Sequence, residues 1–576
     1  MRYTVITGEL TTRTALHIGS GDSSNLADSL LRRDSAGEPL IPGTAIAGVL
    51  RSLLIRLAPR LGHNSCLSLE PAGNAQGLQP CDCPVCELMG SSTIMADYHK
   101  EMHNSRVLVF NAQIMERQPW GAVRDGVGIN RSTGAAAYHA KYNYEILPAG
   151  TKFSLRMELK PDAENLLKLL AAALLEWEAG RLWLGADSAR GLGGMKLDNL
   201  KFNTLELGVK DNLINFLKSD KPWQDTASEE KGWLEEQRKK ISVLSSNEEE
   251  KDQFFAATWL EINGVLEAEG PLLTSDMASA GATGFDHAPL TRRCGDWQNP
   301  VIGGASLRGV IRSHGERIIR TLATLQAVEQ KGIQPQDWFL ERCPACDPLA
   351  QRNKDEKIPL ESCASLHGGR NTEQRDQKPD LCLACQLFGS TLQGSRLRVE
   401  DATFKGDKPK YKILDFLAID RFTGGGMDQA KFDAMVLWKP KFSFRMFLEN
   451  PMPWELGWLA LILRDMESGW LRVGMGASKG FGKVKLRNLD ATLGYLHPDD
   501  LKRFGLSPDA EPEINSLFKT KKISLAEQDK WLQEFHEKVN QFQRNSENNN
   551  LPPLETDSYF NDQKIYELYA SSGELS

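Results

Sequence analysis

Four segments of the chain occur twice and in the same order, and this duplication limits the possible folds more than any other feature of the sequence. KFSLRMEL is matched by KFSFRMFL, LGADSARGLGGMKL by VGMGASKGFGKVKL, INRSTG by IDRFTG, and IPGTAIAGVLRS by IGGASLRGVIRS. Chance does not readily produce such a series, so we infer two copies of one structural unit. The matched pairs are Lys152–Leu159 with Lys441–Leu448, Leu184–Leu197 with Val473–Leu486, Ile129–Gly134 with Ile419–Gly424, and Ile41–Ser52 with Ile302–Ser313.

The first copy changes between strand-like and helix-like patterns. Side chains of alternating polarity predict strands, and apolar residues three or four positions apart predict helices. The strands are expected over Tyr3–Leu16, Arg106–Ile114, Lys152–Leu159 and Met195–Phe202. The first helix is expected to start at about Thr44, with Thr44 as its N-cap residue, and the second to cover Ala163–Glu178. This β-α-β-β-α-β order is the ferredoxin-like pattern. The second copy repeats the order, with helices expected over Ser306–Val328 and Pro453–Glu467.

The limits of the two copies set the expected domains. A first module is expected over residues 1–204, a charged linker over 205–252, a second module over 253–495, and a tail over 496–576 that is partly helical or disordered. Within the tail, a polar helix is expected over Ser524–Phe542, where Ser524 and Glu527 have capping-box spacing.

Composition excludes few functions. The 576 residues are 41% apolar and 25% charged, as in ordinary globular proteins. The net charge of −7 argues against nucleic-acid binding if taken alone, but affinity depends on where the 69 basic residues lie, and much of the acid falls in the linker and tail. The first residues do not resemble a signal peptide, and the apolar run Leu166–Trp177 is too short to span a bilayer. We therefore expect a soluble cytoplasmic protein without membrane contact.

Cysteines are grouped in pairs, as in zinc sites. The second copy contains Cys343-Pro-Ala-Cys346 and Cys382-Leu-Ala-Cys385, and four thiolates in such pairs indicate a tetrahedral zinc ion. Cys363 and His367 are further candidate ligands in this copy. Four protein ligands leave no open coordination position, so we predict two structural zinc sites. The first site would use Cys66, Cys81, Cys83 and Cys86, with His63 as an alternative fourth ligand.

Several motifs together resemble the RAMP superfamily: the turn Pro42–Thr44, the segment Cys382–Ser390, the segment Asp420–Gly424 and the Gly-rich turn Ser478–Gly482. Within it, the chain resembles the repeated backbone subunit of type III CRISPR effector complexes, in the tandem-fusion form of type III-D-like complexes. The resemblance implies an α+β fold with two tandem RRM/ferredoxin-like RAMP modules, each with a zinc-binding insertion and a thumb-like hairpin. It also implies guide RNA, target RNA, a large subunit and further RAMP subunits as partners.

The resemblance further implies which segments contact RNA. Gly-rich turns and helix starts can present amides to phosphate, and the thumb-like hairpins, over Arg124–Tyr144 and Leu414–Lys431, would flip nucleotides out of the guide–target duplex. Each of these motifs alone would more often be an ordinary turn or N-cap. The expected RNA-binding residues are His17, Arg32, Arg33, Gly43, Thr44, Arg51, Arg131, Arg190, Gly191, Gly193, His287, Arg292, Arg293, Ser306, Arg308, Arg312, Arg421, Lys479, Gly480 and Gly482.

In this family an aspartate after the first strand supports cleavage of the target RNA. The matching positions are Asp28 and Asp286, each followed by an arginine pair. The aspartate would accept a proton or hold a divalent cation, for which magnesium is expected, while the 2′-hydroxyl of a flipped nucleotide attacks the adjacent phosphorus. The products would carry a 2′,3′-cyclic phosphate and a 5′-hydroxyl. Asp22, Asp34 and Asp125 are the alternatives in the first copy.

Two other functions stay open at this point. One is a non-catalytic RNA-binding scaffold subunit, against which the Asp followed by an Arg pair in both copies argues. The other is a guide-RNA-processing RAMP endoribonuclease with His17 or His287 as general base. The cysteine groups and the thumb-like segments argue against this second function.

Overall fold

The structure is a computed structural model. It describes residues 2–65, 83–91, 104–116, 122–131, 133–160, 166–220, 228–245, 258–294, 297–329, 343–350, 360–368, 380–525 and 529–542. Two compact units form: Met1–Asp125 with Tyr142–Trp259 and Gly494–Lys521, and Gly126–Lys141 with Leu260–Leu493 and Lys522–Ser576. Among the described residues, no helix has both the length and the apolar character that a membrane span requires.

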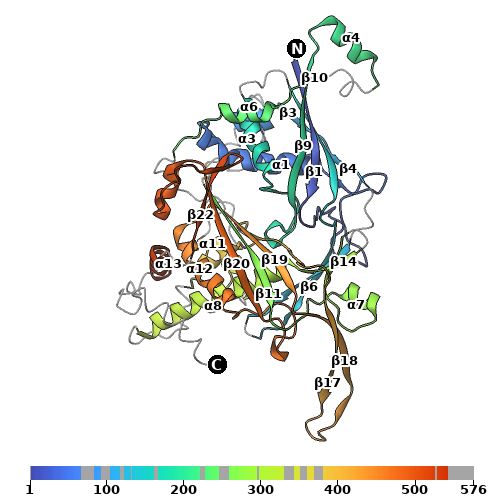
Figure 1. The fold of residues 1–576 in the computed structure, drawn as a ribbon, viewed down its shortest axis with the longest axis vertical. Helices are drawn as coiled ribbons and strands as arrows, with labels where there is room; N and C mark the ends of the chain where they lie inside the picture. Colours follow the sequence, from blue (N-terminus) through green and yellow to red (C-terminus); the bar gives the residue numbers. More distant parts are fainter. Residues whose placement is uncertain are drawn as a thin grey trace. The chain divides into compact units, whose positions relative to one another are not determined.

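The sheet of the first module is built around its first strand, β1 (Arg2–Thr12). This strand pairs antiparallel with β7 (Lys152–Leu159) on one side and with β9 (Gly194–Glu206) on the other. Strand β7 also pairs with β3 (Val107–Val109) and β4 (Ala112–Ile114), and β4 pairs with β2 (Leu40–Ile41). Helices α1 (Gly43–Leu57) and α3 (Leu167–Glu178) contact each other. The elements follow the order β-α-β-β-α-β along the chain (Figure 1).

The second module repeats this arrangement. Its strands β15 (Leu397–Val399), β19 (Lys441–Glu449), β11 (Thr258–Ala268) and β20 (Val484–Tyr495) lie side by side in that order. Helix α12 (Pro453–Glu467) packs on α8 (Gly304–Glu329), where the Trp458 indole donates to Gly315 O at 3.2 Å. The alternation of KFSLRMEL and KFSFRMFL places one face of each strand in a core, since Phe153, Met157, Phe442 and Met446 are buried.

Each module also carries a long antiparallel hairpin. The first consists of β5 (Ala122–Ile129) and β6 (Ala136–Ile146), and the second of β17 (Tyr411–Ile419) and β18 (Gly426–Trp438). The second hairpin extends away from its sheet (Figure 1). Residues 126–141, the outer part of the first hairpin, group with the second unit.

The first helix begins one residue before Thr44, so the prediction of Thr44 as N-cap was wrong. Pro42 is the N-cap residue and provides no side-chain hydrogen bond. The Gly43 amide instead donates to Asn111 Oδ1 at 2.9 Å, so a distant side chain replaces the local cap.

The linker and the tail contain ordered structure. Helix α6 (Trp233–Lys240) packs on α3, and the rings of Trp233 and Phe202 stack at 3.9 Å. Residues 494–521 group with the first unit, where Arg60 and Asp500 form a buried bidentate ion pair at 2.8 and 2.9 Å. Helix α13 (Asp529–Gln541) packs on α12, with Phe535 stacked on Trp458 at 5.9 Å. Glu527 of the expected capping box lies outside the described residues.

The remaining elements are short. They are α2 (Pro84–Met89), α4 (Lys210–Lys218), α7 (Met277–Thr283), α10 (Cys363–His367), α11 (Leu383–Phe388), β8 (Leu182–Trp183), β10 (Ser228–Glu229), β12 (Pro271–Leu272), β13 (Thr291–Cys294), β14 (Trp297–Ile302), β16 (Ala402–Thr403), β21 (Glu513–Asn515), β22 (Phe518–Ile523), and the 3₁₀ turns Ala58–Leu61, Ser188–Arg190, Ala477–Lys479 and Pro498–Phe504.

Candidate functional site

Asp28 and Asp286 lie in the same local structure in the two copies. The Asp28 amide donates to Asn143 Oδ1 at 2.8 Å, and Asp28 Oδ2 accepts from the Asn143 amide at 2.8 Å. The Asp286 amide donates to Asp433 Oδ1 at 2.9 Å, and Asp286 Oδ2 accepts from the Asp433 amide at 2.9 Å. Asn143 and Asp433 lie on equivalent hairpin strands, and both candidate aspartates are exposed. One carboxylate oxygen is therefore held by the hairpin while the side chain stays accessible to a ligand.

A histidine and a serine contact each other beside each aspartate, but only one of the two positions is equivalent between the copies. His17 Nδ1 donates to Glu145 O at 2.6 Å, which leaves Nε2 to accept from Ser29 Oγ at 3.0 Å. In the second copy His287 Nδ1 lies 3.3 Å from Ser275 Oγ. Ser29 and His287 are equivalent positions, since each follows its aspartate and forms a parallel bridge to the hairpin. His17 is buried and both of its ring nitrogens are bonded, whereas His287 is half-buried.

The Gly-rich turns bring one cation to each hairpin base. Arg190 Nη1 donates to the Tyr142 hydroxyl at 2.5 Å, and Lys479 Nζ lies 4.4 Å from the centre of the Phe432 ring. Tyr142 and Phe432 directly precede Asn143 and Asp433, so each cation contacts the same hairpin strand that holds the candidate aspartate. Burial raises the pKa of the Tyr142 hydroxyl, so this group stays protonated and is a neutral partner for Arg190.

The backbone of these turns requires glycine at several positions, whether or not a ligand binds. Gly193 and Gly482 have φ of 75° and 73°, and a Cβ at either would overlap a carbonyl oxygen, of Leu184 or of Val473. Gly191 and Gly480 have φ of 93° and 81°. A Cβ on Gly480 would meet nothing within 4 Å, so its outer side is open.

The helix starts are already bonded within the chain. The Gly43 amide donates to Asn111, as described above, and the Gly304 amide donates to Asp401 Oδ1 at 2.8 Å. These amides are therefore occupied in the structure, although Thr44 and Ser306 are exposed beside them.

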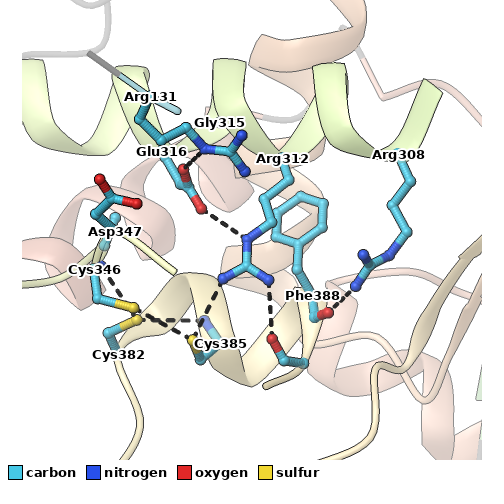
Figure 2. Close-up of polar contacts among 12 residues, drawn as sticks. Arg131, Arg308, Arg312, Gly315, Glu316, Cys346, Asp347, Cys382, Cys385 and Phe388 are labelled. Carbon is cyan, nitrogen blue, oxygen red and sulfur yellow. Dashed lines mark hydrogen bonds and ion pairs between the residues drawn. The ribbon is translucent and has the colours of Figure 1, made fainter. Parts of the chain in front are cut away.

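Three of the predicted RNA-binding arginines bind backbone carbonyls at the ends of the cysteine helices. Arg51 donates to Met89 O at 2.6 Å and to Gly90 O, and Arg312 donates to Gly389 O at 3.0 Å. Arg308 donates to Phe388 O (Figure 2). Cations stabilise the carbonyl ends of helices, so these arginines hold α2 and α11 against α1 and α8.

The arginine pairs after the aspartates differ in their environment. Arg32 is exposed. Arg33 pairs with Glu145 and donates to Gly37 O at 3.1 Å, so it holds the loop that follows Asp28. Arg292 is half-buried on β13, and the side chain of Arg293 lies outside the described residues.

The tip arginines of the hairpins also differ. Arg131 Nε donates to Glu316 Oε2 on α8 at 2.9 Å (Figure 2). Arg421, at the equivalent position, is exposed. Glu316 also accepts from Arg312 Nε at 2.7 Å. Burial alone would lower the pKa of Arg312, but the charges of Glu316 and Cys385 raise it above its ordinary value.

Four buried cysteines of the second copy converge. The Sγ atoms of Cys346, Cys363, Cys382 and Cys385 all lie within 4.8 Å of one another. Amides point at the sulfurs, with Cys382 N 3.3 Å from Cys363 Sγ and Cys385 N 3.4 Å from Cys382 Sγ. Arg312 Nη2 lies 3.5 Å from Cys385 Sγ (Figure 2). This donor set fits a tetrahedral metal–thiolate centre, because the amides and the guanidinium offset thiolate charge.

This group of four differs from the predicted one by a single residue. Cys363 takes the place expected for Cys343, which is buried outside the group. In the first copy, the Cys86 amide lies 3.5 Å from Cys83 Sγ, the same arrangement as in Cys382 and Cys385. Cys66 and Cys81 lie outside the described residues, and His63 is half-buried.

Sequence reasoning missed Asn143, Asp433 and Glu316. The first two could have been found from the INRSTG and IDRFTG match, since they lie at the same distance after it in each copy. Glu316 carried no motif and became visible from its contacts alone.

Two comparisons with known proteins bear on this arrangement. The family model described as the RAMP superfamily matches residues 9–196 and 289–485. The chain is also similar to the protein named CRISPR system Cms endoribonuclease Csm3 from Methanothermobacter thermautotrophicus, with 28% identity over 226 residues, which cover 34% of this chain and 84% of that relative. The two matched regions span more than half of the chain and contain Asp28, the cysteine helices α2 and α11 and both Gly-rich turns, and the second region begins three residues after Asp286; the chain therefore belongs to the RAMP superfamily and contains two of its modules.

Proposed function

We propose that the chain is a backbone subunit of a type III CRISPR ribonucleoprotein that binds guide RNA and cleaves complementary target RNA at Asp28 and Asp286. The observation that carries the proposal is the repeated group of an exposed aspartate, a hairpin base and a turn cation in two RAMP modules. The similar protein is named a CRISPR endoribonuclease, which supports RNA cleavage as the reaction class. The module limits 1–204 and 253–495 remain part of the proposal.

The chemistry follows from what each residue can do. A hairpin that flips one nucleotide of the target aligns its 2′-hydroxyl with the adjacent phosphorus. The aspartate accepts the hydroxyl proton, the new P–O2′ bond forms, and the P–O5′ bond breaks. The departing O5′ takes a proton from water, so the products are a 5′-hydroxyl and a 2′,3′-cyclic phosphate. Arg190 or Lys479 offsets the charge on the phosphate oxygens. A magnesium ion, if bound, would supply further charge neutralisation, and Asp286 and Asp433 are the carboxylates that fit it.

The hairpins and the cysteines have separate proposed roles. The hairpins β5–β6 and β17–β18 would serve as the thumbs that press on the guide–target duplex. Cys346, Cys363, Cys382 and Cys385 would hold a structural zinc ion in the second module, and Cys83 and Cys86 would contribute to a second zinc site. Guide RNA, target RNA and further CRISPR subunits are the proposed partners.

The deciding experiment measures cleavage of a labelled, guide-matched RNA by the assembled complex with Mg²⁺. The variants are Asp28→Ala, Asp286→Ala and the double variant, with Asp22→Ala as an exposed control on the same loop as Asp28. Loss of one distinct product per single variant, and an unchanged pattern for Asp22→Ala, is the expected result. An unchanged pattern in all variants, with guide RNA still bound, would leave a scaffold subunit without cleavage activity.

A further inference from the structure

The first unit contains a cavity of about 670 Å³ that the proposed function does not use. The cavity is lined by Thr4 and Leu159 at one end of the sheet, by helices α3 and α6, and by the turn that holds Leu61 and His63. All of its lining residues belong to this one unit. Sites for small molecules typically measure about 300–1,000 Å³, so the cavity has the size of a ligand site.

The walls of the cavity are fixed by contacts that need no ligand. Helix α6 is held on the sheet by Trp233, whose ring stacks on Phe202 at 3.9 Å. The segment after α6 is held by Leu244, whose amide donates to Arg60 O at 2.8 Å and whose carbonyl accepts from Arg60 Nε at 3.2 Å. Asp500 binds the same guanidinium in the buried ion pair described above. A site with fixed walls loses little conformational entropy when a ligand binds.

A buried amide lines this cavity without a partner from the protein. Gln237 on α6 is 8% exposed and is one of the lining residues. Its side chain forms no hydrogen bond with any residue that the structure describes. Buried polar groups in folded proteins are nearly all hydrogen-bonded, so an amide left open toward a cavity indicates a ligand that supplies its partners.

Three lysines from different parts of the chain also line the cavity. Lys160 follows β7, Lys168 lies in the first turn of α3, and Lys240 is the last residue of α6. Within the described ranges, none of the three forms an ion pair. Two glutamates line the cavity as well, and one of them, Glu230, accepts from the Thr204 hydroxyl at 2.6 Å. The lysines outnumber the carboxylates, and ammonium groups bind phosphate as point charges.

The second module shows that helix packing alone does not require these polar groups. There α13 packs on α12, as α6 packs on α3, and the buried side chains of α13 include Trp531 and Phe535. Beside Trp233, the side of α6 that lines the cavity instead carries Gln237 and Lys240. This side of α6 therefore has a composition that suits a polar ligand better than a helix contact.

We propose that this cavity binds a nucleoside phosphate, with its phosphate at the three lysines and its base beside Gln237. The amide of Gln237 both donates and accepts, so it can pair with the edge of a base. Leu159, Leu167 and Ile241 supply apolar contacts for the ring. Inorganic phosphate is too small to reach both the lysines and these groups. None of the residues proposed for RNA cleavage lines the cavity, so the inference goes beyond the proposed function and does not depend on it.

The test is isothermal titration calorimetry of the purified full chain with ATP, GTP, AMP and inorganic phosphate. At least one nucleotide is expected to bind at one site per chain and more tightly than inorganic phosphate. Lys168→Ala and Lys240→Ala should each weaken this binding about tenfold, since each removes a charge-assisted contact. Both lysines are exposed, so the variants are expected to fold. Lys239→Ala is the matched control, because Lys239 is an exposed lysine of α6 that does not line the cavity.

Gln237→Met separates a ligand contact from a structural role. Methionine has a similar volume but no amide, so nucleotide affinity should fall about tenfold through the lost hydrogen bonds. The urea midpoint of the variant should equal or exceed that of the wild type, because no described residue loses a hydrogen bond. A lower midpoint with unchanged affinity would give Gln237 a structural role and overturn the inference.

Three other outcomes also overturn the inference. The first is the lack of a binding signal from any nucleotide up to about 1 mM, the weak end of specific affinities. The second is equal affinity in the wild type, Lys168→Ala and Lys240→Ala, which places the nucleotide elsewhere on the chain. The third is binding of a 5′-phosphorylated RNA but of no free nucleotide, which makes the cavity an RNA contact. Cleavage at Asp28 and Asp286 is measured separately, so each of these outcomes leaves the proposed function standing.

Discussion

Replacing Glu316 with glutamine is expected to destabilise the second unit more than any other single-atom change near the cysteines. The carboxylate has no exposed surface and faces three arginines, Arg131 at 2.9 Å, Arg312 at 2.7 Å and Arg320 at 3.7 Å. Glutamine keeps the shape but removes the charge, and its amide nitrogen meets donors where an acceptor is needed. Removing one partner of a buried ion pair costs about 3–5 kcal/mol, and the presence of two further arginines puts Glu316→Gln within this range.

Urea unfolding followed by tryptophan fluorescence measures this loss, and Trp458 on α12, which contacts α8, is one of the 13 tryptophans that contribute to the signal. Glu235→Gln is the matched control, because Glu235 pairs with Arg238 at 2.6 Å but is 49% exposed. An exposed pair of this kind contributes less than about 1 kcal/mol. Adding Arg131→Ala to Glu316→Gln should cost less than the same change in the wild type, since the two residues act as a pair. Equal losses for Glu316→Gln and Glu235→Gln would refute the view that α8 carries a buried docking carboxylate.

Three further outcomes are expected. Gly193→Ala and Gly482→Ala should each lower the free energy of unfolding by at least about 1–3 kcal/mol in thermal or urea unfolding, because φ is positive and the added Cβ overlaps a carbonyl oxygen. Gly480→Ala should cost less, because its Cβ meets nothing within 4 Å. Cys363→Ser should remove the zinc ion of the second module, measured by elemental analysis of the purified chain, and Cys343→Ser should retain it; the opposite result would restore the set of ligands expected from the paired spacing. Asp433→Asn should raise the Mg²⁺ concentration needed for cleavage at Asp286 several-fold, and Asn143→Asp should lower the concentration needed at Asp28, because carboxylates bind this ion more strongly than amides. If cleavage depends on the Mg²⁺ concentration in the same way in wild type and variants, these residues are excluded as magnesium ligands.

The elements that the sequence predicted well are those whose periodicity is local. Lys152–Leu159 and Pro453–Glu467 have the same bounds in the sequence analysis and in the structure, since alternation and helical spacing are complete within each segment. The family resemblance pointed to Asp28 and Asp286, whose loops form the same hydrogen bonds to the hairpin strand in the two copies. The packing of the tail was not predicted, because Asp500 meets a residue 440 positions away and nothing local marks it.

The arginines show why site residues are harder to predict than elements. Arg51, Arg308 and Arg312 have the residue type and position of phosphate contacts, yet each guanidinium binds carbonyl oxygens at the end of a neighbouring helix. Charge and spacing cannot separate these two uses, because both need a cation beside oxygen atoms. Cys363 shows the same limit, because the fold brings its sulfur into the group of four, whereas the paired spacing along the chain favoured Cys343.

The ion pair of Arg60 with Asp500 also sets a condition on how the chain is made. A ribosome adds roughly 5–20 residues per second, so Arg60 is synthesised about 20 to 90 s before the carboxylate that lies 440 residues further on. During this time the first unit holds an arginine whose buried position lacks its counter-charge, and it also lacks the rest of residues 494–521. The first module therefore cannot complete its fold while it emerges, and a gene fragment that ends in the linker would encode an unfinished domain.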